Sequence, residues 1–289
     1  MRVKLADRIG FCFGVKRAIH MAEAALKERK KVYSLGSIIH NSQVVESLAG
    51  KGLAIIKDLD ETKGGAVLIS SHGAPPEIFK KIKARGIEII DTTCPFVLHA
   101  QRIAGEMARE GYDVIIVGDQ AHPEVKAIVG SASGRGVVIS DKDDPALADL
   151  GCSRKVAAVA QTTQRLDNLF DVAGRILKKR PREMRIFNTI CSDTGRRQET
   201  VSDLSMRVDA MIIIGGRHSA NTNRLFEVCK NECESHLVET EADLREEWFS
   251  GRETIGIASG ASTPAWVIKK VVNMIENLKT KSVKRKVKV

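Results

Sequence analysis

Three cysteines in this chain are each followed by a histidine or a serine at the same spacing in the sequence, and this repeated spacing strongly constrains the fold. The pairs are Cys12 with His40, Cys94 with His122, and Cys191 with Ser219, each 28 residues apart. An identical offset found three times indicates an internal repeat. At each position an apolar run stops and a helix-like pattern follows, so we expect repetition to bring the three thiols together as a metal or cluster site.

The composition is that of an ordinary globular protein. The chain has 289 residues, of which 43% are hydrophobic and 28% charged, so it can form two or three small domains with real cores. No apolar run approaches the roughly 20 residues that span a bilayer. Charges interrupt the N-terminal segment too early for a secretory signal, and we therefore expect a cytoplasmic location.

The positive charge is concentrated at one end of the chain. Of the net charge of +10, six charges come from residues 279–289, which contain no acid. We expect this segment to be a disordered basic tail, although nucleic-acid binding through it is an alternative. The modest positive balance of the remaining chain suits an anionic small-molecule substrate.

Short apolar runs alternate with segments of helical spacing along the chain. Uninterrupted Val- and Ile-rich runs suit strands buried on both faces of a parallel sheet, and the alternation predicts an α/β fold. The expected strands include 67–70, 87–90, 114–117, 156–160, 210–214 and 254–258, and the expected helices include 15–29, 75–85, 97–110 and 165–179.

These units form three sets of three, and we expect three similar small α/β modules in a pseudo-threefold arrangement. The expected boundaries are 13–93, 94–190 and 191–278, with the last module completed by strand 1–12. A third polar strand end follows in each set, at Ser71-His72-Gly73, at Gln161-Thr162-Thr163 and at Ser262. Ligands of open α/β sheets bind at the carboxyl ends of the strands, so three shared edges would enclose a central cavity.

Each of the three repeated cysteines lies where a strand is expected to give way to a helix. Helix N-terminal amides favour the thiolate there, and three thiolates suit either an iron–sulfur cluster or zinc. Three protein ligands leave one metal position open, which is typical of a catalytic site. The alternative is three inert buried cysteines. The remaining thiols, Cys152, Cys229 and Cys233, fall outside the repeat.

Histidines and hydroxyls occupy the other strand ends. His40, His72 and His122 could bind zinc or hydrogen-bond an anion. Because the thiolates already offer a metal site, we favour a diphosphate pocket that these residues form together with Ser219, Asn221 and Ser262.

Glu124 follows His122 by two residues. A carboxylate near a buried cluster could have a raised pKa and deliver a proton to substrate, or it could simply stabilise a helix N-terminus. The chain lacks GxGxxG, GxxxxGK[ST], HExxH and GxSxG motifs. Reducing equivalents, if used, must therefore come from outside or through the cluster.

Taken together, the motifs resemble one family, the 4-hydroxy-3-methylbut-2-enyl diphosphate reductases of the IspH/LytB type. The resemblance covers residues 1 to about 278. The motifs are GFCFGVKRA (10–18), YSLGSIIHN (33–41), SHG (71–73), DTTCPFV (91–97), HPEV (122–125), QTT (161–163), CSDTGRRQE (191–199), SANTNRL (219–225) and SGASTP (259–264).

This resemblance implies one [4Fe–4S] cluster per chain, held by Cys12, Cys94 and Cys191, with one iron open to substrate. It implies that Glu124 supplies a proton, with Thr162 near the substrate hydroxyl, and that the diphosphate is held by His40, His72, His122, Ser219, Asn221 and Ser262. The implied reaction is reductive dehydroxylation to isopentenyl and dimethylallyl diphosphate, the last step of the non-mevalonate pathway.

A ferredoxin or flavodoxin is implied as the electron donor, and we expect a monomer without membrane or nucleic-acid partners. The alternative function is a metal- or cluster-dependent hydro-lyase or hydrolase that acts on a phosphorylated small molecule without a redox step.

Overall fold

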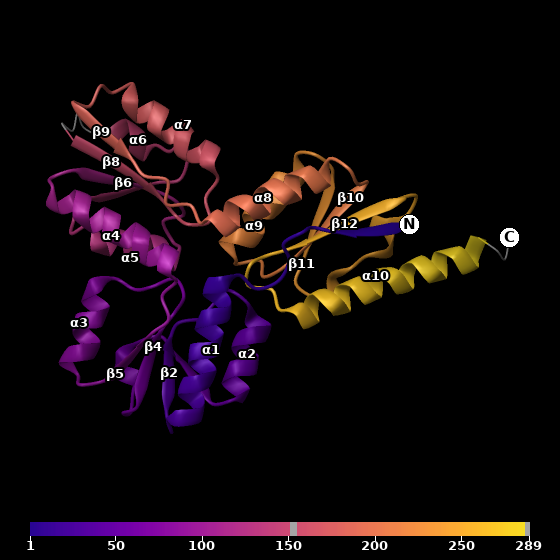
Figure 1. Cartoon of the computed structure of the whole chain (residues 1–289), viewed down its shortest axis with the longest axis horizontal. Helices are drawn as coiled ribbons and strands as arrows, with labels where there is room; N and C mark the ends of the chain where they lie inside the picture. The colour runs from indigo at the N-terminus through magenta and orange to yellow at the C-terminus, as the bar shows by residue number, and fades with distance from the viewer. Residues whose placement is uncertain (151–154, 287–289) are drawn as a thin grey trace. The chain divides into compact units, whose positions relative to one another are not determined.

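The structure, a computed structural model, describes residues 1–150 and 155–286 and contains three four-stranded sheets (Figure 1). Their strand orders are β3-β2-β4-β5, β7-β6-β8-β9 and β11-β10-β12-β1. The strands are β1 (Arg2–Leu5), β2 (Val32–Leu35), β3 (Leu53–Ile56), β4 (Ala66–Ile69), β5 (Glu88–Asp91), β6 (Asp113–Val117), β7 (Gly136–Ile139), β8 (Lys155–Ala160), β9 (Glu183–Ile186), β10 (Ala210–Ile214), β11 (Glu234–Val238) and β12 (Thr254–Ser259).

Helices connect the strands throughout the described chain (Figure 1). The α-helices are α1 (Phe13–Glu28), α2 (Ser42–Gly50), α3 (Pro76–Ala84), α4 (Pro95–Arg109), α5 (Pro123–Ser131), α6 (Ala146–Asp149), α7 (Leu166–Leu177), α8 (Ser192–Ser205), α9 (Ala220–Lys230) and α10 (Ala265–Lys286). Short 3-10 helices are η1 (Leu59–Glu61), η2 (Glu241–Asp243) and η3 (Glu246–Phe249).

The predicted α/β class with mainly parallel sheets is confirmed. Every strand pair in the described residues is parallel, and the three sheets share one order of strands. In the third sheet the fourth strand is β1, which pairs with β12 so that Arg2 lies opposite Thr254. The fourth strand of each sheet leads directly to one of the repeated cysteines.

The chain divides into two compact units. Unit 1 comprises residues 1–12, 40–44 and 192–289 and contains the third sheet, whereas unit 2 comprises residues 13–39 and 45–191 and contains the first two sheets. The predicted arrangement around a central cavity therefore stays a prediction, as do the module boundaries.

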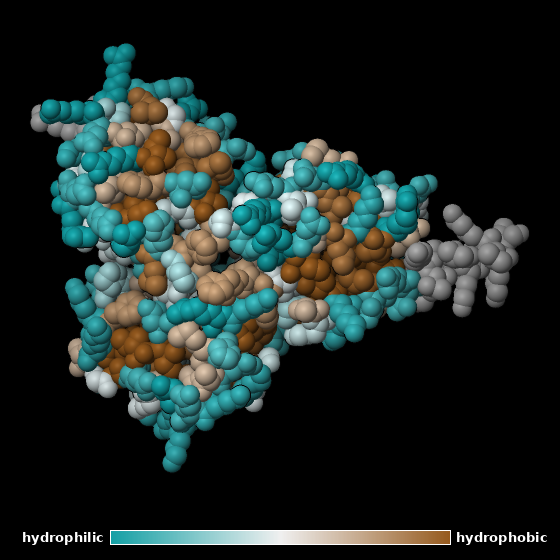
Figure 2. All heavy atoms as spheres, viewed as in Figure 1, coloured by the Kyte–Doolittle hydropathy of each residue, from teal (hydrophilic) through white to brown (hydrophobic). Residues whose placement is uncertain are grey.

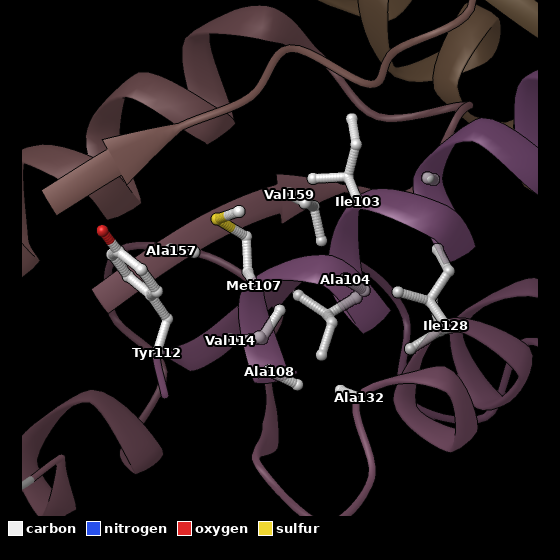
Figure 3. Packing of buried hydrophobic residues seen from close by; sticks show 13 residues of the cluster. Ile103, Ala104, Met107, Ala108, Tyr112, Val114, Ile128, Ala132, Ala157 and Val159 are labelled. Carbon is white, nitrogen blue, oxygen red and sulfur yellow. The ribbon is translucent and has the colours of Figure 1, made fainter. Parts of the chain in front are cut away.

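The second sheet shows why the central strands are continuous apolar runs. In β6, Val114 and Ile116 pack with α4 and α5, whereas Ile115 and Val117 pack with α7 on the other face. Figure 3 shows the first of these clusters, with Met107 of α4 close to the strand residues. Because both faces are covered, alternation of polar residues would bury unpaired polar groups.

The third sheet is also covered on both faces. Ile212 and Ile214 of β10 pack with α10, and Ile213 packs with α8 and α9 through Val201 and Leu225. Hydrophilic residues cover much of the visible outer surface, with hydrophobic side chains showing in patches between them (Figure 2).

Helix α10 differs from the expectation for the basic C-terminal segment. Its backbone continues to Lys286, so residues 279–286 are helical where an irregular tail was expected, and 287–289 lie outside the described residues. In the part of the chain that the structure describes, every helix is too short or too polar to cross a bilayer.

We predict that truncating a central strand residue destabilises the fold far more than truncating an edge residue of the same sheet. Ile116 of β6 is fully buried, whereas Ile186 of β9 is 42% exposed. Ile116→Ala should lower the free energy of unfolding by about 2–5 kcal/mol, because it leaves a cavity, and Ile186→Ala by less than about 1 kcal/mol. Denaturant unfolding of the two variants measures this difference, and equal losses would contradict the assigned core.

Candidate active site

Main-chain hydrogen bonds fix each repeated cysteine at the carboxyl edge of a sheet. Each cysteine amide donates to a carbonyl two residues beyond the end of a central strand: β12, β4 or β8. The three bonds are Cys12 N to Ala261 O at 3.0 Å, Cys94 N to Ser71 O at 3.0 Å, and Cys191 N to Thr162 O at 2.9 Å. The sequence repeat is therefore also a repeat of local geometry, once in unit 1 and twice in unit 2.

All three thiols are chemically suited to ligate a metal. Cys12 and Cys191 directly precede α1 and α8, and Cys94 is the N-cap of α4 without a side-chain cap bond. Each is partly buried, and none forms a disulfide. The amides and dipole of a helix N-terminus favour a thiolate at such positions.

The cysteines outside the repeat have different surroundings. Burial raises the pKa of the Cys229 thiol to about 12, so it stays protonated and packs in the core of the third sheet. Burial also raises the pKa of Cys233. Cys152 lies outside the described residues.

The partners in the 28-residue offset lie at helix N-termini. His40, His122 and Ser219 each come five residues after a strand that ends at Leu35, Val117 or Ile214. They are followed by α2, α5 and α9, and His122 and Ser219 are the N-caps of their helices. The expectation that these three residues lie at the ends of strands was therefore wrong. They lie five residues farther along, where the next helix begins. The displacement matters because N-terminal amides are ready donors to an anion.

In unit 2, two imidazoles lie against each other. The rings of His72 and His122 meet edge to face, with centroids 5.2 Å apart. His122 Nδ1 accepts a hydrogen bond from the Glu124 amide at 3.1 Å, so the neutral ring carries its proton on Nε2. The pair therefore offers N–H donors next to the N-terminus of α5.

Gly73 explains the SHG motif at the His72 turn. Its φ is +76°, and an added Cβ would lie 3.0 Å from Thr93 Cγ2 and 2.5 Å from Gln101 Nε2. The turn that carries His72 therefore packs directly on the segment that carries Cys94, and only glycine fits there without displacing neighbours.

In unit 1, buried polar groups gather at the carboxyl edge of the third sheet. Ser262 Oγ donates to the His40 carbonyl at 3.2 Å. Asn221 is only 5% exposed, yet neither its Oδ1 nor its Nδ2 has a hydrogen-bond partner in the described structure. An unpaired buried amide costs about 1–3 kcal/mol, so this side chain is suited to bind a ligand.

The surroundings of His40 disfavour the protonated, charged form of its imidazole. Burial lowers the pKa of this imidazole, and the nearby His218 lowers it further. At neutral pH the His40 imidazole is therefore neutral, so it could bind a ligand only through hydrogen bonds.

Glu124 of unit 2 is a buried acid whose pKa is strongly raised. It is 2% exposed, and burial raises its pKa from 4.5 to about 7, although two hydrogen bonds from Thr162 oppose the shift. The Thr162 amide donates to Oε1 at 2.6 Å and its hydroxyl to Oε2 at 2.9 Å. Since the Thr162 carbonyl accepts from Cys191, a continuous hydrogen-bonded chain links this carboxyl to a cysteine turn.

Two arginines that bond to the main chain before repeated cysteines were not predicted from the sequence. Arg197 has a side chain only 4% exposed and pairs with Asp193, and Arg17 donates to the Thr93 carbonyl. The acid and the arginine four positions apart in CSDTGRRQE were a usable signal for the first, because that spacing places them on one helix face.

Comparison with known proteins agrees with these motifs. The family described as LytB protein matches residues 3–276. The chain belongs to the LytB protein family. Relatives named "4-hydroxy-3-methylbut-2-enyl diphosphate reductase" include one from Geobacter metallireducens, 43% identical over 96% of this chain and 98% of the relative. Another, from Campylobacter hominis, is 42% identical over 96% of this chain and all of the relative.

Two solved structures of this LytB-type fold are similar over most of the chain. One is described as (E)-4-hydroxy-3-methyl-but-2-enyl diphosphate reductase, the terminal enzyme of the non-mevalonate pathway; it is 41% identical, with a TM-score of 0.70, and the match covers 96% of this chain and 100% of that one. The other, a reductase from Plasmodium falciparum, is 29% identical with a TM-score of 0.89, covering 94% and 87%.

We predict a pH-dependent stability term from Glu124. Its pKa is raised on folding, so the term is fully present below about pH 4.5 and is lost as the pH rises through about 7. Between about pH 5 and 8 the wild type should lose up to about 3 kcal/mol that Glu124→Gln retains. Denaturant unfolding across this range measures the difference. Exposed Glu77, which also follows the first proline of a helix, provides the control Glu77→Gln.

Proposed function

We propose that this chain reduces (E)-4-hydroxy-3-methylbut-2-enyl diphosphate to isopentenyl and dimethylallyl diphosphate. The observation that carries the proposal is the repeated cysteine turn, present in a chain 43% identical to reductases of that name. The buried carboxyl of Glu124 next to the Cys191 turn supports proton delivery in the same region.

The three cysteines fit a [4Fe–4S] cluster. They form no disulfide, are partly buried and lie at helix N-termini, and three sulfur donors would leave one of four irons without a protein ligand. When bound, the cluster would supply two electrons, one at a time, and a Lewis-acidic iron for the substrate hydroxyl. Cys12, Cys94 and Cys191 are the residues that would hold it.

Glu124 is suited to protonate the leaving hydroxyl. The overall step takes up two electrons and two protons, breaks the C4–O bond and releases one water molecule. One proton goes to the departing oxygen and the other to carbon. With a pKa near 7, Glu124 is protonated in a large fraction of molecules at neutral pH and can still give up its proton. Thr162 orients the carboxyl through its amide and hydroxyl.

The diphosphate is bound by the remaining polar groups. His72 and His122 offer imidazole donors at the N-terminus of α5, and Ser219 and Asn221 lie at the N-terminus of α9. The unpaired amide of Asn221 supports this role in particular, since a phosphate oxygen would satisfy its Nδ2. His40 and Ser262 complete the set.

Electrons come from a small ferredoxin or flavodoxin. The net charge of +10 supports association with acidic carriers of this kind, because charge complementarity steers encounter. Cysteines that form no disulfide and must stay reduced support a cytoplasmic location. The enzyme acts as a monomer, with modules bounded at 13–93, 94–190 and 191–278 and strand 1–12 in the last.

We predict that anaerobically purified protein contains about four iron and four sulfide per chain, with an absorption band that fades in air. Cys12→Ser, Cys94→Ser and Cys191→Ser should each lower both contents severely, because each removes one ligand. Cys229→Ser, at a thiol buried in the core, is the control. Stoichiometric zinc without sulfide would contradict the redox assignment and support the hydrolytic alternative.

We predict that Glu124→Gln retains the cluster and binds substrate but loses turnover by about 100-fold or more, because it cannot donate a proton. Steady-state reduction with dithionite and a viologen dye measures turnover, and calorimetric titration measures substrate binding. The control is Glu77→Gln, at the matching position of α3. Wild-type turnover in Glu124→Gln would remove this residue from the mechanism.

A further inference from the structure

A closed ring of hydrogen bonds in unit 1 ties the Cys12 turn to the helix that follows Cys191. Arg197 Nε donates to Asp193 Oδ2 at 2.7 Å, and Arg197 Nη1 donates to the Arg8 carbonyl at 3.2 Å. The Arg8 side chain returns to Asp193 Oδ1 at 3.1 Å. The segment between β1 and Cys12 is thus bonded to the first two turns of α8.

Unit 2 contains a contact of the same kind. Arg17, in the second turn of α1, donates from Nη1 to the carbonyl of Thr93 at 3.1 Å. Thr93 directly precedes Cys94. In both units, an arginine on the helix that begins after one repeated cysteine bonds the main chain just before another.

Both helices carry a pair of adjacent basic residues, four and five residues after Cys12 and five and six residues after Cys191. Each of the two arginines is preceded by an exposed basic residue, Lys16 before Arg17 and Arg196 before Arg197. Only the second residue of each pair reaches the neighbouring turn. The positions five and six residues after Cys94 are His99 and Ala100, so the third repeat does not use an arginine there.

The burial of Arg197 argues for a specific role. An isolated buried guanidinium is costly, and a hydrophobic side chain of similar size would stabilise the core at least as well. What arginine adds is a charge-assisted bond to a main-chain carbonyl in an irregular turn, which fixes that turn in one conformation. Ligand turns held in this way are organised before the metal group binds.

We propose that Arg17 and Arg197 are positioning residues that hold the Cys94 and Cys12 turns ready for the cluster. The proposal rests on the proposed function, since the cluster is what the turns would bind. Each arginine lies on the helix that follows one repeated cysteine and bonds to the segment before a different one. Arg197, on the helix after Cys191, holds the Cys12 turn. Arg17, on the helix after Cys12, holds the Cys94 turn.

The first test measures how firmly the cluster is held. Arg17→Gln and Arg197→Gln should each release iron to a chelator faster than the wild type, by about tenfold at least. This is the effect expected when a group that supports a metal ligand is lost. Arg17→Lys and Arg197→Lys should restore part of the loss, because a lysine keeps the charge and can donate from its single ammonium nitrogen. Lys16→Gln and Arg196→Gln, one position earlier on the same helices, should stay within about twofold of the wild type.

The second test measures the turns themselves by amide hydrogen exchange. In Arg197→Gln, exchange should rise in residues 6–12, whose Cys12 amide is bonded to Ala261, and not in β10. In Arg17→Gln it should rise in residues 92–94 and not in β4. Wild-type exchange and wild-type iron release in both variants would overturn the proposal, as would a rise spread evenly over the sheets, which indicates a general structural role.

The two arginines lie in different units, so they give independent tests. If Arg197→Gln does not fold, Arg17→Gln decides the outcome alone. Exchange can be measured on wild-type and variant protein whether or not metal is bound. A wild type without iron would therefore reject the proposed function while the exchange data still decide whether the arginines hold the turns.

Discussion

One kind of main-chain hydrogen bond occurs once in each sheet, and the position of each repeated cysteine depends on it. The amides of Cys12, Cys94 and Cys191 each bond to a carbonyl two residues past a central strand. The carbonyl position depends on a strand buried on both faces, and that burial requires the helices on each side. The apolar runs therefore determine where the thiols lie, even though the cysteines are outside the cores.

The sequence predicted the central strands better than the edge strands, although the edge strand β5 was predicted as 87–90. The run 210–214 matches β10, and 114–117 differs from β6 by one residue, because strands covered on both faces are uninterrupted apolar runs. The edge strands β3, β7 and β11 were not predicted. They are short and partly exposed. β3 (LAII) and β7 (GVVI) are apolar runs that were passed over, whereas β11 reads ESHLV and hydrophobicity does not mark it. Pairing with a neighbour, which no local pattern records, makes β11 a strand.

For some residues of the site the sequence predicted the identity but not the surroundings, and other residues it did not predict at all. The repeat was enough to single out His122 and Glu124, but not the tertiary contacts that define their chemistry. The pKa of Glu124 depends on burial and on Thr162, which is 38 residues away in the chain. Arg197 was missed for a similar reason, since a charged residue on a helix is usually solvated. The spacing to Asp193 was a local signal, but the second partner of Arg197, the main-chain carbonyl of Arg8, carries no sequence signal.

The pairing of β1 with β12 sets an order of events during synthesis. The N-terminal strand leaves the ribosome first, but the strand opposite Arg2 begins at Thr254, near the end of the chain. Translation at about 5–20 residues per second leaves the first strand without its partner for many seconds. Until Ala261 has emerged, the Cys12 amide has no carbonyl to bond. A nascent or truncated polypeptide without β12 thus lacks the bond that positions Cys12, and the Cys12 turn is completed only after the residues that follow β12 have been made.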